Sequence, residues 1–304
     1  MGQPCRGLRR TARGRTAIMS GLWVPAPAKI NLFLNITGRR ADGYHELQTA
    51  FQLLSFGDLL HIAPATHHQI TLLGDDCDIE VEQNLVYRAA QALREQAIND
   101  KRGRHIGGVD IQIHKRLPAG GGVGGGSSDA ASTLLALNTL WHTAYTLTEL
   151  AQLGLSLGAD VPVFIGGRSC WAEGVGEKIQ PMPLQKGVFL VIKPPCHVAT
   201  AEIFSDPRLT RNHSPITIPR FLEQGAPNVC EDVVKNLYPE VAEALNWLSE
   251  FSPAQLTGTG ACVFAHFPDV QTAQQVLAQR PDGCDGFIAA AMDKSTAHQM
   301  LGLS

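Results

Sequence analysis

Residues 118–129 read PAGGGVGGGSSD, and six of the seven residues from Gly120 to Gly126 are glycine. Glycine in place of alanine costs roughly 0.5–1 kcal/mol per helix or strand position, so this run indicates a backbone that must come close to a partner. Residues 109–113 before it alternate like a strand, and residues 130–141 after it are rich in Ala and Leu like a helix. The order strand, glycine loop, helix is typical of a phosphate site.

Three interpretations of the glycine run are open at this point. A flexible linker would share its composition, but this run joins two ordered elements and is too short to separate domains. A dinucleotide-binding turn requires a βαβ unit with an acidic residue about 20 positions on, and the first acid after Asp129 is Glu149, in a stretch that reads as another helix. A mononucleotide phosphate cradle fits best. It is not a Walker A loop, because no Gly-Lys-Ser/Thr closes it, so the cation must come from elsewhere.

The composition is that of an ordinary globular protein. The chain has 304 residues, 44% hydrophobic and 17% charged, which is enough for two moderate cores. A formal net charge of -3 leaves no general basic field for nucleic acid, and the seven cysteines lack the spacing of a metal site or a disulfide framework. No apolar stretch reaches the roughly 18–20 residues that span a bilayer. These features favour a cytoplasmic protein that holds its anionic ligand locally.

The chain divides into three parts. Residues 1–18 contain five arginines and no acid, which predicts a disordered extension or an upstream start ahead of Met19. Residues 19–174 contain the glycine loop, and residues 175–304 form the second half. Strands and helices mix in both, so we expect an α+β protein with two domains side by side.

Periodicity and turn residues predict the individual elements. Asn84 and Thr148 are the expected N-caps of two helices. A short helix with Thr200 as its cap is expected, and a loop over 205–219. The other predicted helices cover 84–99, 130–141, 148–157, 231–250 and 271–278, and the strands cover 30–35, 47–62, 69–73, 109–113, 161–165, 188–192 and 286–291. Within 256–267, a glycine turn at 258–260 is expected to enter a further apolar strand.

Polar residues at the end of the glycine run have two interpretations each. Ser127 and Ser128 could bond phosphate oxygens or ligate Mg²⁺, which prefers oxygen donors, or they could cap the following helix. Asp129, expected in the first helical turn, is a better partner for the helix dipole than a catalytic base.

A cation is expected near the loop, and Lys29 is a candidate because it lies in a strand that reads as half-buried. The alternative is an exposed strand lysine. Asn31 projects from the same strand face, because side chains repeat every second position. Asp160 is either a base or only the organiser of a turn between two elements, and its sequence surroundings favour neither.

Three segments, in the expected order, resemble the motifs of the GHMP family of small-molecule kinases, which includes galactokinase, homoserine kinase and mevalonate kinase. They are residues 118–128, 27–32 and 256–261. Residues 39–47 and 157–162 narrow the resemblance to the branch whose substrate has a cytidine diphosphate group. It covers essentially everything after Met19.

The resemblance implies a fold and a reaction. The fold is the two-domain GHMP kinase fold, with an N-terminal ATP-binding domain like the ribosomal protein S5 domain 2-like fold and a C-terminal α+β substrate domain. The reaction is transfer of the γ-phosphoryl group of ATP, with Mg²⁺, to the 2-hydroxyl of a cytidine-diphosphate-linked methylerythritol, a step of isoprenoid precursor synthesis.

The resemblance also implies roles for individual residues. Asp160 is the base, and Lys29 is the cation that pairs with it. His45 reads the cytosine edge, while Tyr44 and Phe204 flank the ring. The residues expected to bind ATP are Pro118, Ala119, Gly120, Gly121, Gly122, Val123, Gly124, Gly125, Gly126, Ser127 and Ser128, and the further residues expected to bind substrate are Asn31, Thr257, Gly258, Thr259 and Gly260.

Two other functions are possible from the sequence. Another GHMP kinase, of the homoserine or mevalonate type, would act on a substrate without a nucleotide. A nucleotide-binding regulator would keep the loop without catalysis, but it would need neither Lys29 nor Asp160. No nucleic-acid or membrane partner is expected, and the sequence does not choose between a monomer and a homodimer.

Overall fold

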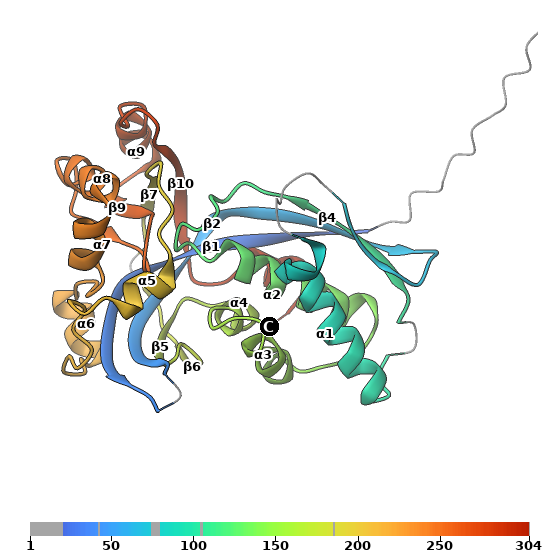
Figure 1. Ribbon diagram of the computed structural model, residues 1–304. Coiled ribbons are helices and arrows are strands. Elements are labelled where there is room, and N and C mark those ends of the chain that lie inside the picture. Colours follow the sequence, from blue (N-terminus) through green and yellow to red (C-terminus); the bar gives the residue numbers. More distant parts are fainter. Residues whose placement is uncertain (1–20, 42, 74–79, 104–105, 185, 304) are drawn as a thin grey trace, which may run out of the picture.

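The computed structural model describes residues 21–41, 43–73, 80–103, 106–184 and 186–303 (Figure 1). The predicted extension of residues 1–18 and the proposed start at Met19 lie outside these ranges. Within them, no helix has both the length and the apolar character that a membrane span requires.

Both halves of the described chain contain strands and helices, so the predicted α+β class is confirmed. In chain order they are β1 (Leu22–Arg39), β2 (His45–Ala65), β3 (Ile70–Leu73), α1 (Leu85–Asn99), β4 (Gly108–His114), α2 (Gly125–Leu140), α3 (Leu147–Leu155), α4 (Val161–Gly166), β5 (Cys170–Gly174), β6 (Lys178–Pro181), β7 (Val188–Lys193), α5 (Thr200–Ser205), α6 (Ile218–Gln224), α7 (Glu231–Leu237), α8 (Pro239–Ser249), β8 (Ala254–Leu256), β9 (Val263–Phe267), α9 (Val270–Leu277), β10 (Asp285–Met292) and α10 (Thr296–Met300).

The first half is a sheet with helices on one face. β1 and β2 pair antiparallel from Leu22 opposite Ile62 to Arg39 opposite His45, β4 pairs with β2, and β3 pairs parallel with β4. The hairpin of β5 and β6 pairs with β2 as well. Figure 1 shows α1 to α4 gathered against this sheet, and their apolar faces bury a core that includes Trp141. This core fixes α2, and with it the helical end of the glycine run.

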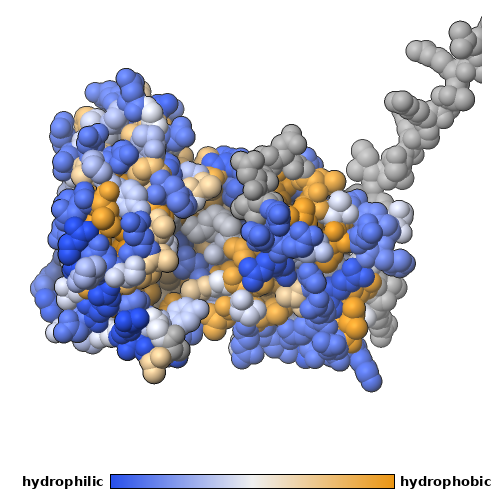
Figure 2. All heavy atoms as spheres, viewed as in Figure 1, coloured by the Kyte–Doolittle hydropathy of each residue, from blue (hydrophilic) through white to orange (hydrophobic). Residues whose placement is uncertain are grey.

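The second half has the strand order β10, β7, β9, β8, all antiparallel. Helices α7, α8 and α9 cover it (Figure 1). β10 also pairs with β2 at Leu54, so the sheet continues from one half into the other. Val123 of the glycine run and Phe264 of β9 share a third apolar cluster between the halves. Figure 2 shows the surface hollowed between the two halves.

The domain division at residue 174 stays a prediction. β6 lies beyond it but pairs with β5, and β10 returns to β2.

Two predicted elements are wrong. Residues 161–165 form the helix α4 and not a strand, because Pro162 is well placed in a first helical turn and Gly167, at φ +61°, ends the helix. The single long helix expected over 231–250 is broken into α7 and α8, because Pro239 excludes helical geometry from Tyr238 before it. Two short helices, α6 and α10, are not among the predicted elements.

Asn84 caps α1 as predicted, since its side chain accepts from the N–H of Val86 at 2.9 Å. The cap of α3 is Thr146, however, and not Thr148. Thr146 Oγ1 accepts from the N–H of Glu149 at 3.2 Å, and the Glu149 carboxylate accepts from the N–H of Thr146 at 2.7 Å. This reciprocal capping box lies two residues before the predicted cap, and α3 begins at Leu147.

We predict that Thr146→Ala lowers the free energy of unfolding by about 1 kcal/mol, because the N–H of Glu149, in the first helical turn, loses its side-chain acceptor. Thr148→Ala is the matched control, because Thr148 is exposed and makes no cap. We expect it to stay within about 0.5 kcal/mol of the wild type in urea titration. Equal losses in both variants would contradict this assignment of the cap.

Candidate active site

The glycine loop has a backbone that other residues could not adopt without strain. Gly120, Gly122 and Gly124 have φ values of +64°, +73° and +74°, in the left-handed region. A Cβ at Gly122 would also lie 2.4 Å from the carbonyl oxygen of Thr257. The glycines therefore serve both backbone conformation and close approach.

The third motif packs directly against this loop. The N–H of Cys262 donates to the carbonyl of Gly121 at 3.1 Å, and Thr257 Oγ1 donates to the carbonyl of Gly122 at 3.2 Å. Thr257 is fully buried, and its hydroxyl also accepts from the N–H of Asn31 at 3.0 Å. The side chain of Thr257 thus joins the three motifs of the resemblance to one another.

The other threonine of this motif has a different partner. Thr259 Oγ1 lies 2.9 Å from the hydroxyl of Thr200, on α5. Thr200 was the predicted cap of α5 but is its first residue, after Ala199. Thr259 is 7% exposed.

Lys29 lies in β1 with 3% of its surface exposed, so the alternative of an exposed strand lysine is wrong. Its ammonium donates to Asn31 Oδ1 at 2.7 Å and to the carbonyl of Gly122 at 3.0 Å, and it lies 3.2 Å from Asp160 Oδ2. These three contacts can use all three of its protons. Nζ also lies 5.1 Å from the centroid of the Phe51 ring. Lys29 thus connects the glycine loop to Asp160.

Asp160 faces Lys29 and does not cap the helix that follows it. It occupies the N-cap position of α4, but its side chain makes no capping bond. About a third of the side chain, 32%, is exposed, and it lines the same cleft as the glycine loop. A carboxylate that is paired to a lysine and open to a cleft has the surroundings of a reacting group.

Asn31 is on the same strand face as Lys29, as predicted, and is 3% exposed. Its Nδ2 donates to Thr49 Oγ1 at 2.9 Å, and its Oδ1 accepts from Lys29. Asn31 does not line the cleft. Its contacts orient Lys29.

The serines do not cap α2. The helix begins at Gly125 after Gly124, so Ser127 and Ser128 are its third and fourth residues, and no side chain bonds at the cap. Ser127 lines the cleft. Ser128 is fully buried, and its Oγ has no hydrogen-bond partner within the described ranges. Of the two, Ser127 is therefore the one placed to contact a ligand.

Asp129 is in the second turn of α2, so its predicted place in the first turn is wrong. Its Oδ2 accepts from Lys115 Nζ at 2.8 Å. Burial raises the pKa of Asp129 to about 7, and the negative Asp58 nearby adds to this, whereas Lys115 opposes it. Asp129 also belongs to the residues of α2 that line the cleft of the glycine loop.

The cleft itself has a volume of about 450 Å³. The whole glycine run lines it, together with Asp160 on one side and Asn84 and Leu85 at the start of α1 on another. The N-terminus of α2, a helix of 16 residues, opens into it. A helix N-terminus and free loop N–H groups favour an anionic ligand such as phosphate.

Of the three residues predicted to bind the cytosine ring, two are in contact with each other. The rings of His45 and Phe204 stack with centroids 5.0 Å apart at 18°, although they come from β2 and α5. Arg211 holds the end of α5 by donating to the carbonyl of Phe204 at 2.8 Å. Tyr44 is 63% exposed. The structure thus joins the two halves through His45 and Phe204.

The protonation of His45 follows from its surroundings. Burial lowers its pKa below 6.5, and the positive charges of Arg211 and Arg39 lower it further. Its Nε2 is buried and has no hydrogen-bond partner among the residues that the structure describes. A neutral imidazole presents one donor and one acceptor, as a base edge requires.

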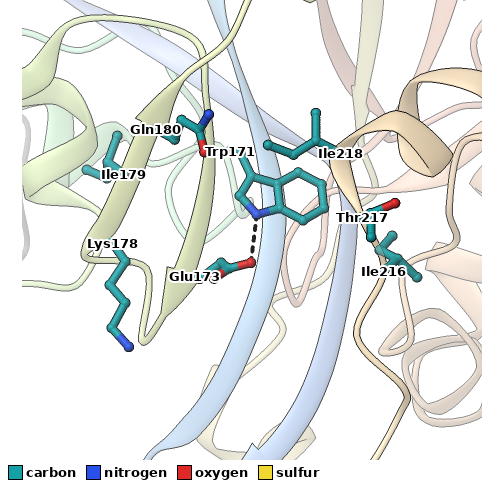
Figure 3. A pocket seen from close by; sticks show the side chains of 8 residues that line it. All are labelled: Trp171, Glu173, Lys178, Ile179, Gln180, Ile216, Thr217 and Ile218. Carbon is teal, nitrogen blue, oxygen red and sulfur yellow. Dashed lines mark hydrogen bonds between the residues drawn. The ribbon is translucent and has the colours of Figure 1, made fainter.

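A second hollow, of about 470 Å³, lies at the β5–β6 hairpin and the start of α6 (Figure 3). Trp171 donates its indole N–H to Glu173 at 3.0 Å there, and this bond and one from Gln48 lower the pKa of Glu173. The hollow shares no residue with the cleft at the glycine loop.

Asp58 and Lys115 are charged residues of the site region that are not among the residues predicted from the sequence. Lys115 lies just before the glycine run, and Asp58 is a charged residue in a mostly apolar stretch of β2, with Phe56 before it and Leu59 after it. These two signals were available, because a buried charge in a strand requires a partner.

Comparison with known families and proteins gives consistent matches. Residues 84–168 match the model of the GHMP kinases N terminal domain, and residues 208–285 match that of the GHMP kinases C terminal domain. The chain is 50% identical to the 4-diphosphocytidyl-2-C-methyl-D-erythritol kinase of Halorhodospira halophila over 91% of this chain and 95% of that protein. It is 51% identical to the enzyme of the same name from Nitrosococcus oceani, over 90% and 95%.

Solved structures agree with this. A crystal structure of 4-(cytidine 5'-diphospho)-2C-methyl-D-erythritol kinase matches with a TM-score of 0.76 and 30% identity, over 89% of this chain and 99% of that one. A mevalonate kinase of Methanococcus jannaschii matches with a TM-score of 0.64, over 92% and 100%, but at 15% identity it shows only the same fold.

Proposed function

Because the chain belongs to the 4-diphosphocytidyl-2-C-methyl-D-erythritol kinases of the GHMP family, we propose that it transfers the γ-phosphoryl group of ATP to the 2-hydroxyl of that cytidine diphosphate derivative. The products are the 2-phosphate and ADP, in isoprenoid precursor synthesis. The observation that carries the mechanism is the contact of 3.2 Å between Lys29 and Asp160 in the cleft of the glycine loop. The predicted cytoplasmic location and the choice between monomer and homodimer stay predictions.

The reaction forms a bond between the acceptor oxygen and the γ-phosphorus and breaks the bond between that phosphorus and the β–γ bridging oxygen. Phosphoryl transfer leaves little covalent chemistry to the protein, which mainly positions and stabilises charge. The hydroxyl proton has to leave as the new bond forms. In our proposal Asp160 accepts it, because this carboxylate is exposed to the cleft and is not used as a helix cap.

Lys29 orients Asp160 and stabilises the negative charge that develops between the carboxylate and the phosphoryl group. Its bond to the carbonyl of Gly122 ties the loop to the base. Asn31 holds the Lys29 ammonium through its Oδ1, and Thr49 in turn holds Asn31. We therefore propose that Asn31 positions Lys29 and does not contact the substrate directly.

The loop N–H groups and the N-terminus of α2 would hold the phosphates of ATP, with Ser127 as the side chain that opens into the cleft. Mg²⁺ would be held chiefly by phosphate oxygens, with Ser127, Asp129 or Asp160 as the oxygen donors nearby. No group of three or more metal-ligating side chains is present in the described part of the chain. The ion, when bound, neutralises charge on the phosphates.

The cytidine diphosphate end would lie between the halves of the molecule. His45 is proposed to read the cytosine edge, with Tyr44 and Phe204 at the ring, and the backbone of Gly258 and Gly260 with Thr259 to hold the diphosphate. The support is the neutral state of His45, its unused Nε2 and its stacking on Phe204.

We predict that Phe204→Ala raises KM for the cytidine diphosphate substrate by about ten-fold or more, because base stacking is worth about 1–3 kcal/mol. KM for ATP should stay within about two-fold. Phe251→Ala is the matched control, because Phe251 is also a partly exposed aromatic residue of the C-terminal half, but its ring packs edge-to-face on Trp247. Steady-state kinetics with each substrate varied in turn measure the effect, and an unchanged acceptor KM would remove Phe204 from the site.

The function itself is tested by ADP release with the cytidine diphosphate substrate, beside mevalonate and homoserine as acceptors. We expect turnover only with the first. Turnover of mevalonate or homoserine alone would favour another GHMP kinase, and ATP binding without any turnover would favour a regulator.

A further inference from the structure

Asp58 is a fully buried carboxylate that none of the roles above uses. It lies in β2, and its Oδ1 accepts from the N–H groups of Arg116 at 2.5 Å and Leu117 at 2.7 Å. Its Oδ2 accepts from Lys115 Nζ at 2.5 Å. All three donors belong to the segment that leads from β4 into the glycine loop.

The same carboxylate also reaches the other end of the loop. Lys115 bonds Asp129 Oδ2 at 2.8 Å, and Asp129 belongs to α2, which follows the loop. At Gly125, the first residue of α2, a Cβ would lie 3.6 Å from Asp58 Oδ2. Asp58 is thus bonded to the start of the loop, lies close to Gly125 at its other end, and is linked to α2 through Lys115.

This arrangement is costly for stability alone. One lysine serves two carboxylates with side-chain exposures of 0% and 4%, and Asp129 Oδ1 has no partner within the described residues. Buried ion pairs often stabilise no more than apolar side chains of the same volume, and in some proteins they specify one arrangement of the chain. The role of Asp58, Lys115 and Asp129 is therefore expected to lie in the glycine loop, whose two ends these residues join.

We propose that Asp58 is a positioning residue for the nucleotide, which sets the distance between the two ends of the glycine loop and so directs the loop N–H groups at the phosphates of ATP. This rests on the proposed use of the loop as the ATP site. Asp58 does not line the cleft, so it acts through the loop and through Lys115. A displacement of about 1 Å at such a site can cost two orders of magnitude in rate.

The test is Asp58→Asn, which keeps the size of the side chain but turns an amide NH₂ toward the Lys115 ammonium or toward the two backbone N–H groups. We expect the Kd of a non-hydrolysable ATP analogue, measured by calorimetry, to rise about ten-fold. KM for ATP should rise in parallel, while KM for the cytidine diphosphate substrate stays within about two-fold. A purely structural role would lower the melting temperature without this split.

Leu248→Ala is the control for lost stability, because Leu248 is fully buried in α8, in the core of the other half. We expect it to melt earlier and to bind the analogue like the wild type. The proposal is wrong if Asp58→Asn binds the analogue within two-fold of the wild type, or if both variants weaken binding equally.

If Asp58→Asn does not fold, Lys115→Met and Lys115→Arg decide the matter. Arginine keeps a charged bridge between the two carboxylates, so it should retain analogue binding, whereas methionine should weaken it about ten-fold. Wild-type binding by Lys115→Met, or equal losses in both, would overturn the proposal. Analogue binding needs no acceptor, so a wild type that binds the analogue but does not phosphorylate the cytidine diphosphate substrate refutes the proposed acceptor and leaves the inference on Asp58 testable.

Discussion

Asp160→Asn is expected to lower kcat by roughly 10²–10⁴-fold, because the asparagine amide cannot accept the proton of the acceptor hydroxyl. The change keeps the size of the side chain, and the neighbouring Lys29 keeps its bonds to Asn31 and Gly122. KM for both substrates should change by less than about three-fold, because the variant loses an interaction of the transition state and not one of binding. Single-turnover measurement of ADP formation, with both substrates saturating, separates the chemical step from product release.

The matched control for this variant is Asp269→Asn. Asp269 also occupies a helix N-cap position, before α9, but its side chain does cap, by accepting from the N–H of Thr272 at 2.7 Å. We expect Asp269→Asn to have the same kcat as the wild type. A residual activity of Asp160→Asn above about a tenth of the wild-type rate would exclude Asp160 as the base, because general base catalysis is worth at least about 10².

Lys29→Met is expected to lower kcat by about 10³-fold and to raise KM for ATP as well. The first effect follows because a preorganised cation at developing negative charge is worth about 10²–10³ in rate. The second follows because Lys29 also bonds the carbonyl of Gly122 in the ATP loop. Lys29→Arg should not rescue the rate, since a planar guanidinium cannot reproduce three contacts that diverge from one nitrogen.

Lys193→Met is the control for removal of a partly buried lysine. Among the described residues, Lys193 donates to the carbonyls of Pro194 and Cys196, in the other half of the molecule. We expect kcat within about two-fold of the wild type. Thermal melting of both variants checks that they are folded, and a Lys29→Met enzyme with near-normal kcat would show that Asp160 works without its lysine.

The two substitutions should not be additive. Since Lys29 acts on Asp160 directly, the double variant should be little slower than the worse single variant, as for residues that act as one unit. Full additivity of the two losses would indicate that the residues contribute independently, despite their separation of 3.2 Å.

The sequence was enough to predict those parts of the site that depend on backbone angles and on the period of a strand. The glycines were predicted as a close-approach loop because a run of them gives up side chains at a cost, and three of them do have positive φ, where most other residues are strained. Lys29 and Asn31 were expected on one strand face from the period of two, and their side chains are bonded. The pairing of Lys29 with Asp160 came from the family resemblance and not from spacing, since the two lie far apart in the chain.

Where local signals were short or conflicting, the interpretation was wrong. Residues 161–165 are five apolar residues, a length at which strand and helix patterns cannot be told apart, and packing against α2 and α3 made them helical. Ser127 and Ser128 have the composition of caps, but the helix extends back to Gly125 because glycine tolerates the left-handed turn before it.

The sequence by itself determined the chemistry available to this protein: a loop without side chains, a lysine and an aspartate in recognisable motifs, and two α+β halves that bury separate apolar faces. Only the tertiary structure decided how these parts meet. It brought the Asp160 carboxylate to Lys29, stacked His45 on Phe204 across the two halves, and placed Asp58 beneath the loop. The physical reason is that backbone angles and side-chain periodicity are set within a few residues, whereas contacts between distant segments depend on how whole sheets and helices pack.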